Sequence, residues 1–78
     1  MAELVLYQSD WCPYCRKVTS YLKSRNIEIP IKDSSEDPQA AEELRAMTGR
    51  GQVPCLSIDG APLLESSDII QWFEENWQ

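Results

Sequence analysis

An α/β fold, with a four-stranded mixed sheet flanked by three helices, is predicted for this chain of 78 residues. The order of the elements is the first reason, because strand-like and helix-like segments alternate as β-α-β-α and are followed by a β-hairpin and a helix. The second reason is length, since 78 residues can bury one small core but not two. Residues 1–78 are therefore expected to form a single domain.

The first strand and the first helix are indicated by the segments on either side of a cysteine pair. Residues 4–7, with the sequence LVLY, form a short apolar run that is typical of a buried strand. Val18 and Leu22 then have helical spacing, which favours a helix over about residues 13–25. Pro13 suits the first helical position, because its missing N–H would have no partner there.

A second strand is predicted over residues 27–31. Ile27, Ile29 and Ile31 alternate with other residues, which gives the period of two that a strand requires. Pro30 cannot donate a backbone hydrogen bond to a neighbouring strand. This strand is therefore expected at an edge of the sheet.

A second helix is predicted after a polar connection at residues 33–38. Asp37 is expected to cap this helix and Pro38 to begin it. Its apolar stripe consists of Ala40, Ala41, Leu44 and Met47. Gly49 is expected to end the helix, because glycine readily adopts the left-handed conformation found at helix C-termini.

A β-hairpin is predicted next. Residues 53–58 are expected to form a loop that enters a strand, and residues 61–64 the return strand. Asp59-Gly60 between them is a strong signal for a two-residue turn. Pro62 suits an edge position, for the same reason as the proline of the second strand.

A third helix is predicted from the last apolar stripe, which consists of Ile69, Ile70, Phe73 and Trp77. Ser66 or Ser67 is expected to be its N-cap residue, because serine hydroxyls accept hydrogen bonds from free backbone N–H groups. Asp68 would then lie in the first turn, where a negative charge interacts favourably with the helix dipole.

The most informative motif is Cys12-Pro13-Tyr14-Cys15, in which two thiols are close enough to form a disulfide with each other. Cys12 is expected at the start of the first helix, where free N–H groups favour a negative charge on its sulfur. A thiolate is the attacking species in thiol–disulfide exchange, and Cys15 would lie one turn away to resolve a mixed disulfide. The motif therefore predicts a redox site.

Two other interpretations of the pair are less favoured. A protein zinc site needs about four ligands, and the chain has no histidine and only one further cysteine, Cys55. No metal is therefore expected. A structural disulfide across two residues would close a very short loop and constrain the unfolded chain little. Cys55 begins a buried strand and is expected to be a small core thiol, with a third redox thiol as the alternative.

The net charge of −6 argues against nucleic acid or an anionic membrane as the main partner. No apolar run approaches the length of a membrane span, and the N-terminus lacks the basic and apolar regions of a signal peptide. A cytoplasmic location is therefore expected, where a cysteine pair is more often catalytic than structural. Nothing in the sequence requires more than a monomer.

The chain resembles the glutaredoxins, small members of the thioredoxin-like superfamily, over essentially its whole length. The motif at residues 12–15, the Val53-Pro54 pair, the Asp59-Gly60 turn and Ser67-Asp68 carry the resemblance. It implies a thioredoxin-like fold, and a cis peptide bond before Pro54 beside the cysteines. The backbone of Val53 would then face a groove and pair with an extended peptide such as glutathione, while Tyr14 shields the site.

The chain also departs from many glutaredoxins near the cysteine pair. Ser9 occupies the position where many of them carry a basic residue, and Asp10 follows it. The charge of Asp10 should oppose part of the stabilisation that the helix start gives to a thiolate. Leu64-Glu65 replaces the Gly-Gly pair that many glutaredoxins have before the last helix.

The segment from Gln52 to Ile70 is similar instead to the glutathione-binding half of glutathione S-transferases. The resemblance implies that Glu65 meets the ammonium group of glutathione, and that Ser66 binds its carboxylate with hydroxyl and N–H, with Ser67 beside it. A solvated Glu65 and a simple capping role for Ser66 are the alternatives. Arg50 and Gln52 would flank the same groove near the glycyl carboxylate, although Arg50 could equally be a solvated loop charge.

The sequence therefore predicts a dithiol glutaredoxin, a glutathione-dependent disulfide oxidoreductase. Its partners would be glutathione and proteins that carry disulfides or mixed disulfides with glutathione. Cys12 would attack, and Cys15 or a second glutathione would release the intermediate. Two alternatives are a thioredoxin-like electron donor reduced by a flavoenzyme, and a carrier of a [2Fe–2S] cluster held by Cys12 and glutathione.

Overall fold

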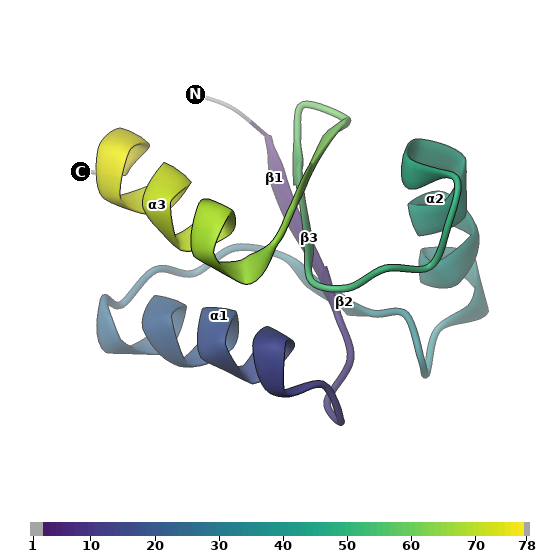
Figure 1. Cartoon of the computed structure of the whole chain (residues 1–78), viewed down its shortest axis with the longest axis horizontal. Coiled ribbons are helices and arrows are strands. Elements are labelled where there is room, and N and C mark those ends of the chain that lie inside the picture. The colour runs from purple at the N-terminus through teal and green to yellow at the C-terminus, as the bar shows by residue number, and fades with distance from the viewer. Residues whose placement is uncertain (1–2, 78) are drawn as a thin grey trace.

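The computed structural model describes residues 3–77 as a mixed sheet with helices on both faces (Figure 1). The strands are β1 (Leu4–Gln8), β2 (Ile31–Asp33), β3 (Cys55–Ile58) and β4 (Ala61–Leu64). The helices are α1 (Pro13–Ser24), α2 (Pro38–Thr48) and α3 (Ser66–Asn76). The order in the sheet is β2-β1-β3-β4, with β1 parallel to β2 and the other pairs antiparallel. The predicted α/β fold is confirmed.

Two apolar clusters lie on opposite faces of the sheet, because successive side chains of a strand point to opposite sides. The larger cluster lies under α1 and α3 and consists of Leu4, Leu6, Val18, Leu22, Ile27, Leu56, Ile69 and Phe73. The smaller one lies under α2 and consists of Tyr7, Ala40, Leu44 and Cys55. Figure 1 shows α1 and α3 on one side of the sheet and α2 on the other.

The predicted second strand is wrong in its position. It was expected over residues 27–31, whereas β2 spans Ile31–Asp33 at the edge of the sheet. Leu6 pairs with Ile31, so the same register would place Val5 opposite Pro30. Proline has no N–H to donate, so the ladder cannot continue through it, although the Pro30 carbonyl still accepts from Leu6 N–H at 3.0 Å. Residues 27–30 instead lead from α1 to the sheet.

The expected signals at α2 and at the hairpin are confirmed. Asp37 is the N-cap of α2, and its Oδ1 accepts a hydrogen bond from the backbone N–H of Gln39 at 3.0 Å. Gly49 ends the helix in the left-handed conformation, with φ of 79°. Asp59 and Gly60 also have positive φ, as a type I′ turn between β3 and β4 requires.

The predicted N-cap of α3 is wrong. Ser66 or Ser67 was expected there, but Ser66 is already the first helical residue and Glu65 is the N-cap. The Glu65 carbonyl accepts the first helical hydrogen bond, from Ile69 N–H at 3.0 Å, and its side chain makes no capping bond. The expected position of Asp68 in the first turn is confirmed.

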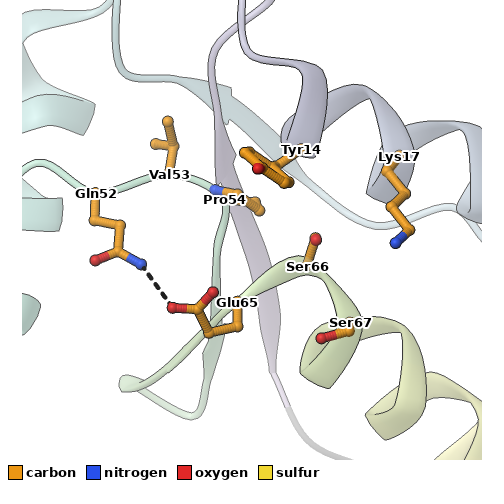
Figure 2. A pocket seen from close by; sticks show the side chains of 8 residues that line it. All are labelled: Tyr14, Lys17, Gln52, Val53, Pro54, Glu65, Ser66 and Ser67. Carbon is orange, nitrogen blue, oxygen red and sulfur yellow. Dashed lines mark hydrogen bonds between the residues drawn. The ribbon is translucent and has the colours of Figure 1, made fainter.

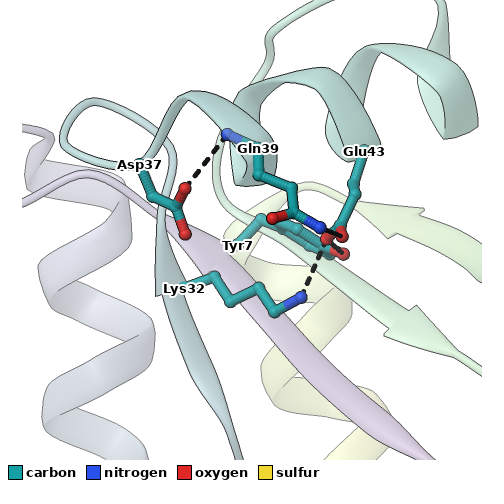
Figure 3. A network of polar contacts seen from close by, with 5 residues as sticks. All are labelled: Tyr7, Lys32, Asp37, Gln39 and Glu43. Atoms are coloured by element: carbon teal, nitrogen blue, oxygen red, sulfur yellow. Dashed lines mark hydrogen bonds and ion pairs between the residues drawn. The ribbon is translucent and has the colours of Figure 1, made fainter.

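A polar network fixes α2 to the sheet (Figure 3). The Glu43 carboxylate of α2 accepts a hydrogen bond from the Tyr7 hydroxyl and pairs with the Lys32 ammonium group, both at 2.8 Å. Burial, together with the hydrogen bond to Glu43, raises the pKa of Tyr7 to about 12. The Lys32 ammonium group holds the pKa of Glu43 below its usual value. One carboxylate therefore links α2 to β1 and to β2.

No helix within residues 3–77 is long and apolar enough to cross a membrane.

Removing the α2 cap tests the first of these local assignments. Asp37→Ala is expected to lower the free energy of unfolding by about 1 kcal/mol, because the N–H of Gln39 loses its partner. Urea denaturation of the two proteins measures the difference. Glu36→Ala is the matched control, since it removes the same charge from an adjacent exposed position that makes no capping bond. Equal destabilisation by both changes would contradict the role of Asp37.

Candidate active site

Cys12 lies at the end of the loop that joins β1 to α1. It is the N-cap residue of α1, with Pro13 at the first helical position as predicted. Its N–H donates to the Ser9 carbonyl and its own carbonyl accepts from Arg16 N–H, both at 3.1 Å. Only 6% of Cys12 is exposed. The sulfur is therefore held on a fixed backbone at the positive end of a helix.

Cys15 is fully buried one turn further along α1. The backbone N–H of Ser9 donates a hydrogen bond to its Sγ at 3.4 Å. Burial raises the pKa of Cys15 to about 12; a hydrogen bond with the Cys12 side chain acts in the same direction, and the Ser9 N–H opposes it. Cys15 is therefore a protonated thiol at neutral pH. The two cysteines therefore have different surroundings, although they lie only three positions apart.

A cavity of about 440 Å³ opens beside Tyr14, at the start of α3 (Figure 2). Its lining residues are Tyr14, Lys17, Gln52, Val53, Pro54, Glu65, Ser66 and Ser67. They come from α1, from the loop before β3, and from the N-cap and first turn of α3. Such a volume is typical of small-molecule sites. The cavity carries both charges, a carboxylate at Glu65 and an ammonium group at Lys17.

The peptide bond between Val53 and Pro54 is cis, as the glutaredoxin resemblance implied. Both residues line the cavity, and Figure 2 shows the Pro54 ring beside the Tyr14 side chain. On the other side, the Gln52 amide donates a hydrogen bond to Glu65 Oε1 at 3.4 Å. This bond joins the loop before β3 to the start of α3.

The cavity brings together most of the residues that the sequence assigned to it, with one exception and one addition. Arg50 is not among the lining residues; it follows the end of α2, where its N–H donates to Thr48 Oγ1 at 3.1 Å. Lys17 does line the cavity, although the sequence did not assign it there. Its spacing of three from Tyr14 on a helix is the signal that could have placed it on the same face.

Glu65 has an unusual backbone for a residue with a side chain, with φ of 77° and ψ of 122°. Positive φ brings the Cβ atom close to the backbone, which favours glycine and costs other residues about 1–2 kcal/mol. The Glu65 carboxylate does not cap the helix but lies in the cavity wall. Such strained residues concentrate at functional sites.

The third cysteine is remote from this site. Cys55 is fully buried with Tyr7 and Leu44 on the α2 face of the sheet, whereas Cys15 belongs to α1 on the opposite face. Burial raises the pKa of the Cys55 thiol. The expectation of a core thiol is confirmed, because the sheet separates this sulfur from the cysteine pair.

Two aromatic side chains next to Cys12 are exposed. Trp11 is 72% exposed and Tyr14 is 66% exposed. Neither is needed to fill the core, so both are free to contact a molecule that approaches the sulfur. Within residues 3–77, no group of three or more potential metal-ligating side chains is close enough together to hold a metal ion.

Residues 6–78 match the family model of the glutathione S-transferase N-terminal domain. A glutaredoxin-like 8.6 kDa protein from a rubredoxin operon of Clostridium pasteurianum is 36% identical over 55 residues, which cover 70% of this chain and 73% of the relative. Glutaredoxin 3 of Escherichia coli is 32% identical over 74 residues, covering 88% of this chain and 83% of the relative.

Solved structures of longer proteins share the fold. Glutathione transferase Omega 3C from Trametes versicolor superposes with a TM-score of 0.79 at 26% identity. The superposition covers 94% of this chain but only 33% of the transferase. The chain therefore corresponds to one part of that protein.

Glycine at position 65 tests whether the backbone there is strained. Glu65→Gly is expected to raise the free energy of unfolding by about 1 kcal/mol, because glycine adopts positive φ without a steric penalty. Urea denaturation checks it. Gln71→Gly, in the middle of α3, is the matched control and should lower the same quantity by about 1 kcal/mol. A loss of stability in Glu65→Gly would argue against strain.

Proposed function

Because the chain belongs to the glutaredoxins of the thioredoxin-like superfamily, we propose that it is a dithiol enzyme that uses glutathione to reduce mixed disulfides and protein disulfides. The observation that carries the proposal is the inequality of the two thiols. Cys12 lies at a helix start, and Cys15, which is fully buried within the helix, has its pKa raised to about 12. A nucleophile and a resolving thiol need this difference.

The reaction begins with attack by the Cys12 sulfur on a disulfide of the substrate. If the substrate is a protein joined to glutathione, the bond between them breaks, Cys12 takes the glutathione, and the protein leaves as a thiol. A second glutathione can then attack the mixed disulfide on Cys12 and leave as glutathione disulfide. With a protein disulfide, Cys15 displaces the substrate from Cys12, and glutathione reduces the resulting Cys12–Cys15 disulfide.

Glutathione would occupy the cavity beside Tyr14. The backbone of Val53 is proposed to pair with its cysteinyl unit, and the Glu65 carboxylate to meet its ammonium group. The γ-glutamyl carboxylate would lie against the N–H groups of Ser66 and Ser67, because the start of a helix attracts anions. Lys17 lies on the facing helix and adds a positive charge at the same end of the cavity.

Gln52 is proposed to contact the glycyl end of the peptide. The Gln52 side chain already donates a hydrogen bond to Glu65, so bound glutathione would exchange this contact for its own. Proteins that carry glutathione or disulfides are the proposed partners, and the reducing cytoplasm is the compartment that suits this chemistry.

Serine at each cysteine position separates the two roles. Cys12→Ser is expected to abolish glutathione-dependent reduction of a small mixed disulfide, because the attacking sulfur is lost. Cys15→Ser should retain this activity and lose the reduction of protein disulfides, which needs the second thiol. Steady-state rates with glutathione and glutathione reductase measure both. Equal loss in the two variants would refute these roles, and turnover only with thioredoxin reductase would point to a different electron donor.

Neutralising Lys17 tests the placement of the γ-glutamyl carboxylate. Lys17→Gln is expected to raise KM for glutathione by about threefold with little change in kcat, which corresponds to one partly exposed ionic contact. Lys23→Gln is the matched control, since it removes the same charge from the last turn of α1, away from the cavity. An unchanged KM in Lys17→Gln would remove this residue from the binding site.

A further inference from the structure

The positive charge of this acidic chain is concentrated on α1 and its flanks. Residues 11–27 carry four basic side chains and no acidic one. The rest of the chain carries three basic and thirteen acidic side chains, so that the net charge is −6. Like charges gathered on one face create a local field that attracts molecules of the opposite sign. The helix that begins at Cys12 is therefore a positive surface on a negative protein.

Two of the four basic side chains lie toward α3. Lys17 lines the cavity beside Tyr14 and points toward the start of α3 (Figure 2). The Arg25 guanidinium pairs with the Glu74 carboxylate of α3 at 2.8 Å. These two charges therefore belong to the side of α1 that carries the proposed glutathione site and the contact with α3.

The other two basic side chains, Arg16 and Lys23, form a separate stripe. Together with Ser20 they follow helical spacing along one line of α1, and all three residues are exposed. Arg16 and Lys23 are about 10 Å apart along the helix axis, because each residue of a helix rises 1.5 Å. Within residues 3–77, neither of them makes an ion pair. Both charges of this α1 stripe are therefore available to a partner.

The end of the α1 stripe nearest to Cys12 is held in place. Arg16 Nε donates a hydrogen bond to the Asp10 carbonyl at 3.1 Å, whereas the Asp10 carboxylate accepts from the Gln8 side-chain amide, also at 3.1 Å. The guanidinium is thus fixed at the loop before Cys12 without an ion pair. Trp11 in the same loop is 72% exposed. Tryptophan and arginine are enriched among the residues that dominate the binding energy of protein interfaces.

We propose that the α1 stripe, together with Trp11, docks an acidic segment that lies next to the reactive cysteine of a protein substrate. This inference rests on the proposed function and names a class of its protein substrates. An extended chain advances about 3.3 Å per residue, so acidic side chains three positions apart would match the two cations. The stripe residues do not line the cavity beside Tyr14, which stays open for glutathione.

Peptides joined to glutathione through one cysteine test the docking. One peptide carries glutamate at the third and sixth positions after its cysteine, and its partner carries glutamine there. A second pair has the same residues before the cysteine, which covers the opposite chain direction. Reduction with glutathione and glutathione reductase gives kcat/KM for each. In one direction we expect about a fivefold preference for glutamate, as two exposed ionic contacts would give, and its loss at high salt.

Variants of the α1 stripe assign this preference to its two cations. Arg16→Gln and Lys23→Gln should each lower the ratio of the two kcat/KM values by about twofold, and the double variant should remove the preference. A changed reactivity of Cys12 would affect both peptides equally and cancel in this ratio. Arg45→Gln is the matched control, since it removes the same charge from an exposed position on α2, on the opposite face of the sheet. It should keep the full preference.

The outcomes separate the docking from the chemistry. Equal kcat/KM for glutamate and glutamine peptides in both chain directions would overturn the docking inference. A preference that survives in the double variant, or that Arg45→Gln lowers to the same extent, would also overturn it. Failure of the unaltered protein to reduce any of the four peptides would instead refute the proposed function.

Discussion

The burial of Cys15 beneath the start of α1 is the constraint on which the rest of the site depends. The Ser9 N–H fixes its sulfur, and burial keeps the thiol protonated at neutral pH. The chain then places Cys12 at the helix N-cap, one turn earlier, where the backbone favours negative charge. Two identical side chains therefore lie in different surroundings, one at the N-cap of α1 and one buried within its first turn.

The sheet brings the remaining parts of the site to this helix start. Tyr7 at the end of β1 pairs with Cys55 at the start of β3, so the loop that carries the cis Val53–Pro54 bond emerges beside the loop that carries Cys12. β4 then returns the chain to Glu65, at the N-terminus of α3. Backbone strain at Glu65 is thus located where its carboxylate lies in the cavity wall.

The sheet also separates the cysteine pair from the residues that pack under α2. Cys12 and Cys15 lie with α1 on one face, whereas Cys55 is packed among apolar residues under α2 on the other. The ion pair between Glu43 and Lys32 also lies on the α2 face, where it joins α2 to β2.

The sequence by itself determined what depends on neighbouring residues: the cysteine pair, the Asp37 cap, the Gly49 stop and the Asp59-Gly60 turn. Each is a local signal whose conformation follows from the side chain or its absence. Only the tertiary structure decided where β2 begins, because that depends on which residue lies opposite Pro30. It also placed Lys17 in the cavity wall and left Arg50 outside it, and it made Glu65 the cap of α3. Those outcomes depend on how separate elements meet, and one-dimensional spacing does not contain that information.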